Sequence, residues 1–237
     1  MKILCIILLL FLPAISWSAE ISVGSISLSI PHPDGFSPVT PQMTLLFDLK
    51  KQAVAPTNNE FVTFIPEQDV QAAMNNELTN FPRYFSVQTS KKFMKLSVTT
   101  SFFEMLKNFI KSQNNEVIKR VEAELPELMG NLSERLKDKY DADLALSVYK
   151  IIPMPVHKET DHIISFSSLI RYDVNDENGN RVSSVGVVTT TSVLVKSKML
   201  VLYSYAEESD LEWSKEASIK WAQKVVSANH SDLKVTK

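Results

Sequence analysis

Residues 164–206 read ISFSSLIRYDVNDENGNRVSSVGVVTTTSVLVKSKMLVLYSYA, and this stretch decides the fold. Apolar and polar residues alternate in its first part, which is the pattern of a β-strand with one buried face. Asn178-Gly179 then predicts a hairpin turn, and two further runs, Val182–Val195 and Met199–Ala206, predict two more strands. The last run is apolar on both faces, so we expect it inside the sheet and covered on both sides. The stretch therefore predicts an antiparallel meander.

The flanking sequence extends this meander and ends it with a helix. The same alternation over residues 144–156 predicts an earlier strand, joined to the next one by the polar tip Lys158–Asp161. After the meander, the segment Ser209–Glu212 fits a capping box that begins a C-terminal helix. Trp213 and Trp221 follow on this helix, and large aromatic residues usually anchor a helix to a sheet. We expect Trp221 in the core and Trp213 only partly buried.

The first half of the chain mixes short strands and helices. Alternation over Ile21–Ile30 predicts one strand with an irregularity at Gly24. The region Ser101–Tyr140 predicts two consecutive amphipathic helices, because its apolar residues recur every three or four positions around an interruption at Gln113–Asn115. Packing against the sheet is favoured over a coiled coil or a membrane-surface helix, since sustained heptads and a basic face are both missing. The other expected elements are helices at 43–51 and 67–78, and strands beginning at 61, at 85–87 and within 93–98.

Together these elements predict an α+β fold class. We expect an antiparallel meander sheet of about five to seven strands, packed with amphipathic helices and completed by the Trp-bearing C-terminal helix. With 44% hydrophobic and 22% charged residues, the 237-residue chain has the composition of a globular protein. We predict a signal peptide over residues 1–19 and a single α+β domain over residues 20–237.

The N-terminus has the composition of a secretory signal peptide. Lys2 precedes an unbroken apolar run, Ile3–Ile15, which is followed by small residues. The run is shorter than the roughly 20 apolar residues that a membrane span needs, so cleavage after Ser18, or after Ala19 as second choice, is favoured over an uncleaved anchor. The only cysteine, Cys5, would leave with the signal. An exported chain without disulfides indicates a bacterial periplasm.

Charge and glycine content argue against several classes of partner. The chain carries 25 Lys and Arg against 27 Asp and Glu, a formal charge of −2. It has no basic excess to bind nucleic acid, and we expect contact with a membrane only through the signal before its cleavage. With five glycines in all, the chain also lacks a phosphate-cradling loop motif. We therefore expect no cofactor.

The proline-rich segment Pro31–Pro41 is the one loop that the sequence singles out as a possible binding loop. It carries His32, Asp34 and Phe36 within five residues. Rigid loops beside a sheet often hold binding sites. The alternative is a stiff connector that covers a sheet edge.

Metal binding and serine catalysis each have one candidate. His157, Glu159, Asp161 and His162 could be metal ligands, because a hairpin can bring two imidazoles together across its strands. We favour a solvated polar tip and expect no stoichiometric metal. The motif Ser147–Lys150 has the S-x-x-K spacing, but on a strand residues three apart point to opposite faces, so the lysine cannot reach the serine hydroxyl.

The order of elements resembles that of the PsbP/Mog1-like class of α/β domains. The shared features are an N-terminal strand leading into the turn Pro33–Phe36, then helices, a long antiparallel meander, and a terminal helix that carries Trp213, Trp221 and Asn229. This resemblance implies an accessory or binding module and supplies no catalytic residues. The chain is also similar to uncharacterised exported proteins of Gram-negative bacteria.

Two functional hypotheses follow from these observations. The first is a non-catalytic periplasmic accessory protein that binds an unknown protein or a small apolar ligand, without catalytic residues. The second is an exported hydrolase whose carboxylates and histidines assemble only in three dimensions. Buried acids with raised pKa values in a large cleft would favour the enzyme. A dry apolar cleft or an exposed apolar patch would favour binding.

Overall fold

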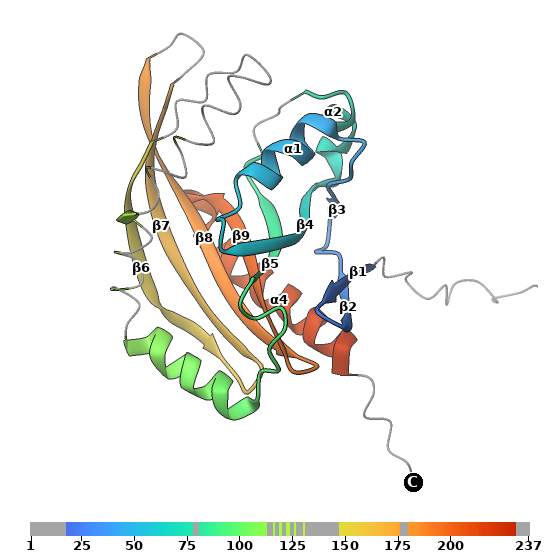
Figure 1. Ribbon diagram of the computed structural model, residues 1–237. Helices are drawn as coiled ribbons and strands as arrows, with labels where there is room; N and C mark the ends of the chain where they lie inside the picture. Colours follow the sequence, from blue (N-terminus) through green and yellow to red (C-terminus); the bar gives the residue numbers. More distant parts are fainter. Residues whose placement is uncertain are drawn as a thin grey trace, which may run out of the picture.

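The structure is a computed structural model of the chain (Figure 1). It describes residues 18–77, 81–112, 147–175 and 180–230, together with residues 116, 119, 122, 123, 126 and 130. No helix in these ranges is long and apolar enough to cross a membrane.

The described strands form a two-stranded and a seven-stranded sheet, both antiparallel. The strand order of the large sheet is β3-β4-β5-β9-β8-β7-β6. The small sheet consists of β1 (Ser18–Val23) and β2 (Ile26–Pro31). The strands of the large sheet are β3 (Phe36–Pro38), β4 (Asn58–Pro66), β5 (Tyr84–Ser90), β6 (Ser147–Glu159), β7 (Ile163–Asn175), β8 (Arg181–Val195) and β9 (Lys198–Glu207).

The fold class is α+β with a large antiparallel sheet, as the sequence predicts. Strands β6 to β9 form the predicted meander, and β9 lies inside the sheet between β8 and β5. Its covering is unequal, however. The side of β9 that carries Leu200 and Leu202 is fully buried, whereas Val201, Tyr203 and Tyr205 on the other side stay partly exposed. The expectation that β9 lies inside the sheet is confirmed, and the expected covering is complete on one side and partial on the other.

Helix α4 (Leu211–His230) closes one face of the large sheet, behind the strands in Figure 1. Trp221 is 2% exposed, and its ring makes edge contacts with Phe64 and Phe85 at 5.7 and 5.0 Å between centroids. Its Nε1 donates a hydrogen bond to the Pro31 carbonyl oxygen at 2.8 Å. Trp213 is only partly buried, so both tryptophan expectations are confirmed. The helix begins at Leu211 after the 3₁₀ turn η2 (Glu208–Asp210).

A layer of small hydroxyl side chains lies between α4 and the sheet. Ser214 of α4 shares a hydrogen bond with Thr189 of β8 (2.7 Å) and donates another to Ser204 of β9 (3.1 Å). Thr189 in turn shares one with Ser167 of β7 (2.9 Å). All four residues are completely buried. Their small size allows α4 to approach the strands closely, and the mutual hydrogen bonds satisfy the buried oxygens.

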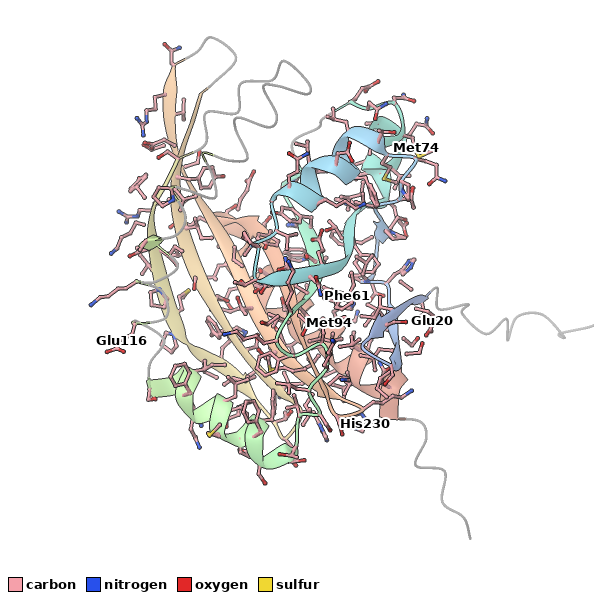
Figure 2. All side chains as sticks on the ribbon, in the orientation of Figure 1. Glu20, Phe61, Met74, Met94, Glu116 and His230 are labelled. Atoms are coloured by element: carbon pink, nitrogen blue, oxygen red, sulfur yellow. The ribbon has the colours of Figure 1, made fainter. Side chains whose placement is uncertain are left out.

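Asn229 fastens the β1–β2 hairpin to the end of α4. Its Oδ1 accepts from the Ser29 amide (3.0 Å), and its Nδ2 donates to the Ser29 carbonyl oxygen (2.7 Å). This side chain therefore bonds the outer edge of β2 as a neighbouring strand would. Figure 2 shows the resulting proximity, with Glu20 on the hairpin and His230 at the helix end.

Two strand predictions are wrong in this part of the chain. Residues Ile21–Ile30 form a hairpin rather than one strand, because the chain reverses at Gly24, which has φ +63°. A side chain there would also lie 2.5 Å from the Met94 carbonyl oxygen, so only glycine fits. The segment 93–98 forms turns and an irregular loop instead of strands. Buried Lys198 fixes this loop by donating to the carbonyl oxygens of Met94 and Leu96.

The remaining helices lie in the first half of the chain. Helix α1 (Thr44–Gln52) confirms the predicted helix at 43–51. The helix predicted at 67–78 is shorter, with the 3₁₀ turn η1 (Glu67–Asp69) followed by α2 (Val70–Met74). Residues 100–112 are helical, and Phe103 from this helix packs into a cluster with the sheet, as predicted. The interruption predicted at 113–115 and the hairpin turn at 178–179 lie outside the described residues.

Candidate functional site

The face of the large sheet that points away from α4 carries a wall of tyrosines. Tyr203 and Tyr205 are two residues apart on β9, so both point to this face, and Tyr84 of β5 pairs directly with Tyr205. The rings of Tyr84 and Tyr205 stack with centroids 4.2 Å apart and planes inclined by 12°. The Tyr203 ring lies 6.0 Å from that of Tyr205. The pairing of β5 with β9 thus gathers aromatic rings from distant parts of the sequence.

A cavity of about 600 Å³ opens beside this wall. We call it the tyrosine groove. Its aromatic lining is Phe81, Tyr84, Tyr172 and Tyr205, and Val148 and Ile170 are among its aliphatic residues. Small-molecule sites usually measure about 300–1,000 Å³ and combine apolar walls with a few polar groups. The groove has this size and this composition.

Lys50 covers one end of the tyrosine wall. It comes from the last turn of α1, and its Nζ lies 3.3 Å from the centroid of the Tyr84 ring. An ammonium over a tyrosine face is a cation–π contact. Burial lowers the pKa of Lys50 to about 8, although the negative charge of Glu60 acts in the opposite direction. The amine is therefore less strongly protonated than a surface lysine.

Glu60 forms the polar floor next to Lys50. Its Oε1 accepts from Thr63 Oγ1 (2.7 Å) and from Ser86 Oγ (2.6 Å). In a regular strand Glu60 and Thr63 would point to opposite faces. A bulge between Glu60 and Val62 shifts the register by one residue and turns both side chains to the tyrosine face.

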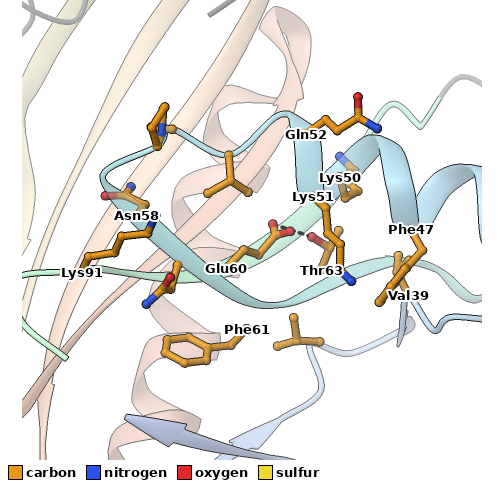
Figure 3. Close-up of a pocket in the computed structure, with 15 residues that line it drawn as sticks. Val39, Phe47, Lys50, Lys51, Gln52, Asn58, Glu60, Phe61, Thr63 and Lys91 are labelled. Carbon is orange, nitrogen blue, oxygen red and sulfur yellow. Dashed lines mark hydrogen bonds between the residues drawn. The ribbon is translucent and has the colours of Figure 1, made fainter. Parts of the chain in front are cut away.

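A second cavity, of about 490 Å³, lies between the end of α1 and the start of β4. Figure 3 shows the side chains of Glu60 and Phe61 on opposite sides of β4, as expected for successive strand residues, and both residues line the cavity. Lys50, Lys51 and Lys91 also line it. Lys50 therefore lines the second cavity. Its amine also covers the ring of Tyr84, and Tyr84 lines the tyrosine groove.

Burial keeps three phenol groups of this face protonated, those of Tyr84, Tyr203 and Tyr205. Burial raises the pKa of Tyr203 to about 12. It also raises the pKa of Tyr84 and of Tyr205, and Glu60 adds to both shifts. Neutral phenols can donate hydrogen bonds, whereas phenolates cannot. These three phenols therefore add aromatic surface and hydroxyl donors to a face that also carries the acidic group of Glu60.

The proline-rich loop predicted from the sequence lies against α4, on the other side of the sheet. Phe36 belongs to the core, where its ring meets that of Phe85 edge-on at 4.8 Å. Asp34 bridges two lysines of α4, Lys220 at 2.8 Å and Lys224. Hydrogen bonds from these lysines hold the pKa of Asp34 below its ordinary value. Two of the three predicted residues therefore fasten the loop.

His32, the third residue of this loop, packs its ring against Phe64 at 5.2 Å. Burial lowers the pKa of His32, although Glu67 acts in the opposite direction. A cavity of about 240 Å³ remains between the loop and α4, lined by Asp34, Phe36 and Trp221 among others. It is less than half the volume of the tyrosine groove.

The structure does not bring the predicted metal ligands of the hairpin tip together. His157 Nε2 lies 3.1 Å from Ser165 Oγ, whereas the His162 ring contacts the ring of His230 at 4.5 Å. Glu159 accepts from Lys111, and Asp161 is exposed. Within the described ranges, no three His, Cys, Asp or Glu residues are placed to hold a metal ion.

The tyrosine groove was not predicted from the sequence. The i, i+2 spacing of Tyr203 and Tyr205 was visible, but both residues were interpreted as buried strand positions. Nothing local to Tyr84 or Lys50 indicates that the two would meet, because their contact depends on pairing between β5 and β9 and on the placement of α1.

Comparison with known proteins adds structural neighbours but no family. No protein-family model matches the sequence, and no curated protein matches it. Among solved structures, the Ran-binding protein Mog1p of Saccharomyces cerevisiae is similar at 11% identity and a TM-score of 0.29, over 90% of this chain and 93% of that one. Cyanobacterial PsbP (CyanoP) from Synechocystis sp. PCC 6803 is similar at 12% identity and a TM-score of 0.30, over 91% and 93%. These neighbours have the two folds named from the element order, at identities and TM-scores too low to assign this chain to their family.

Proposed function

We propose that this protein is a non-catalytic binding protein that holds a small molecule with an apolar or aromatic body in the tyrosine groove. The main observation behind this proposal is the groove itself, a cavity of about 600 Å³ with three tyrosines in its wall. A flat apolar ligand can stack on these rings, since aromatic pairs contribute about 0.5–1.5 kcal/mol beyond the area they bury. The neutral phenols can donate hydrogen bonds to a polar group of the same ligand.

The titration of the carboxyl groups supports binding over hydrolysis. A carboxylate pair in a hydrolase needs one group with a raised pKa to act as the acid. Among the residues that the structure describes, each carboxyl group with a clear shift instead has a lowered pKa, and the largest cause is a hydrogen bond to a neighbouring side chain. These groups are Asp34, Glu159, Asp173 and Asp210. Such carboxylates are held in the ionised form that structural ion pairs need.

The groove can be tested with the apolar fluorescent probe 8-anilinonaphthalene-1-sulfonate. We expect the folded protein to enhance its fluorescence, and Tyr205→Leu and Tyr172→Leu to weaken its binding at least about fivefold, the equivalent of one lost aromatic contact. Tyr149→Leu is the matched control, because Tyr149 is 52% exposed on β6 and is outside the lining of the groove. Equal binding by all three variants would reject the groove as the site.

We also propose that the chain is exported, with the bacterial periplasm as its compartment. Support comes from the signal-like composition of residues 1–19. The described structure is compatible with cleavage there, because β1 begins at Ser18 and a cut after Ser18 or Ala19 leaves most of that strand in place.

Fusion to a reporter that is active only outside the cytoplasm tests the export proposal. Residues 1–19 should confer activity on the reporter, and sequencing of the recovered protein should give Ala19 or Glu20 as the first residue. Recovery of uncut chain from the membrane fraction would instead support the anchor alternative.

A further inference from the structure

We propose that the helix over residues 100–112 and the loop before it form a docking surface for anionic lipid membranes. The surface has an apolar patch of four exposed side chains: Leu96, Phe102, Met105 and Phe109. Two lysines of the preceding loop, Lys92 and Lys95, are exposed close to Leu96 in the sequence. The inference is independent of the tyrosine groove, which lies elsewhere on the molecule.

The helix is apolar on two sides, and only one of them is used by the fold. Phe103 is completely buried and packs with Leu106 and Ile110 in a cluster on the sheet. On the other side, Met105 is 58% exposed and Phe109 is 48% exposed. A helix that merely covers a sheet needs a single apolar stripe. The described fold therefore leaves Met105 and Phe109 of the second stripe exposed.

The loop before the helix is fixed in place beside the patch. Lys198 Nζ donates to the Leu96 carbonyl oxygen (2.9 Å), and the Val98 amide donates to the Ser197 carbonyl oxygen (2.9 Å). The side chain of Leu96 is nevertheless 51% exposed. The rings of Phe93 and Phe102 join the loop to the helix, with centroids 6.1 Å apart.

The charges around the patch favour an anionic partner. Lys92 and Lys95 are exposed on the loop, on both sides of Phe93 and Met94 in the sequence. Two carboxylates near the patch are paired with lysines, since Glu104 lies 2.6 Å from Lys107 Nζ and Glu159 accepts from Lys111. A third acidic residue, Glu116, is helical and exposed. The loop lysines thus leave a local positive charge, although the whole chain has a formal charge of −2.

The residue types favour a membrane over a protein partner. Protein interfaces are enriched in Tyr, Trp and Arg and depleted in Lys. Interfacial helices instead combine Phe and Leu with lysines that contact anionic headgroups. The patch has the second composition. The sequence predicts no basic face on the helix itself, whereas the exposed lysines lie on the loop before it.

Vesicle co-sedimentation tests the proposal directly. The probes are vesicles of phosphatidylcholine alone and vesicles of phosphatidylcholine and phosphatidylglycerol in equal parts. The experiment uses the chain from Ser18 onward, so that the apolar N-terminal stretch cannot insert into the vesicles by itself. All described elements begin at or after this residue. We expect binding to the anionic vesicles only, and weaker binding as salt is raised.

The variants separate the apolar and the electrostatic contribution. Phe109→Ser and Met105→Ser should each weaken binding about tenfold or more, since both side chains would be buried in the interface. Lys92→Gln and Lys95→Gln should each weaken it about fivefold. Met74→Ser is the matched control, because Met74 is also exposed (42%) but lies on α2, far from the helix in Figure 2; it should bind like the parent.

Unchanged thermal unfolding of the variants would show that these exposed positions do not disturb the fold. Absence of binding to the anionic vesicles, or binding that the four patch variants leave unchanged, would overturn the proposal. Self-association in gel filtration that Phe109→Ser abolishes, without vesicle binding, would assign the patch to a second copy of the chain and overturn it equally.

Discussion

The two faces of the large sheet are built from alternate residues of the same strands, yet they differ in almost every physical property. On the face under α4, buried aromatic rings surround Trp221, and four buried hydroxyl groups form hydrogen bonds with one another. On the other face, Tyr203 and Tyr205 are partly exposed beside the tyrosine groove, and Lys50 has a lowered pKa. The first face is arranged for stability, and the second keeps groups that cost stability but can contact a ligand.

This difference implies that substitutions on the two faces should have separable effects. Changes under α4 should lower the free energy of unfolding because they open cavities or leave polar groups unpaired. Changes on the tyrosine face should affect binding more than stability, and removal of its buried charge should even stabilise the protein. Each prediction below tests one side of this division.

The largest effect is expected from Trp221→Ala under α4. The substitution removes the largest fully buried side chain and its hydrogen bond to Pro31, so we expect a loss of about 3–5 kcal/mol in the free energy of unfolding. Urea denaturation measures this through the unfolding midpoint. Trp213→Ala should cost less, because Trp213 is only partly buried. An unchanged midpoint for Trp221→Ala, combined with lost ligand binding, would move Trp221 from the core to the binding site.

An intermediate effect is expected from Ser214→Ala in the hydroxyl layer. Removal of this oxygen leaves Thr189 and Ser204 each without one buried partner, which should cost about 1–3 kcal/mol. Ser218→Ala is an internal control on the same face of α4. Ser218 is also buried, but its Oγ has no partner in the part of the chain that the structure describes, so its loss should be neutral or stabilising. Equal destabilisation by both variants would show that cavity formation, and not hydrogen bonding, matters in this layer.

The sequence predicted the sheet better than the site, and the reason is the range of the interactions involved. Strands β7, β8 and β9 are adjacent in the chain; β7 and β8 alternate with period two and β9 is an apolar run, so local pattern was sufficient to predict their meander. The hairpin reversal at Gly24 was interpreted as an irregularity, because alternation continues through the turn on both sides.

The candidate site depends on contacts that no local pattern contains. Tyr84 meets Tyr205 only because β5 inserts next to β9. Glu60 and Thr63 share a face only because a bulge shifts the register of β4, and bulges rarely leave a clear signal in a single sequence. Asp34 and Phe36 were found from turn chemistry, but their fastening to α4 is a tertiary property. Local chemistry therefore predicted a loop and missed the groove.

The smallest effect is expected from the titration of Lys50 on the tyrosine face. Its pKa is about 8 in the folded state against an ordinary value of 10.5. Below pH 8 the amine is protonated in both states, and the folded state carries the cost of burying its charge. Between these two values the unfolded chain binds more protons than the folded one, so stability rises with pH. We expect stability to rise by an amount on the order of 1 kcal/mol, allowing for water at a partly exposed side chain.

Lys50→Met should remove this rise and be more stable than the parent at neutral pH. Lys51→Met is the matched control, since Lys51 lies on the same helix turn, 4.2 Å from the ring of Phe47, and is exposed; it should keep the rise. Urea midpoints measured through the pH window decide the matter: a rise that persists in Lys50→Met would show that the tyrosine face, like the face under α4, buries no charge at a cost.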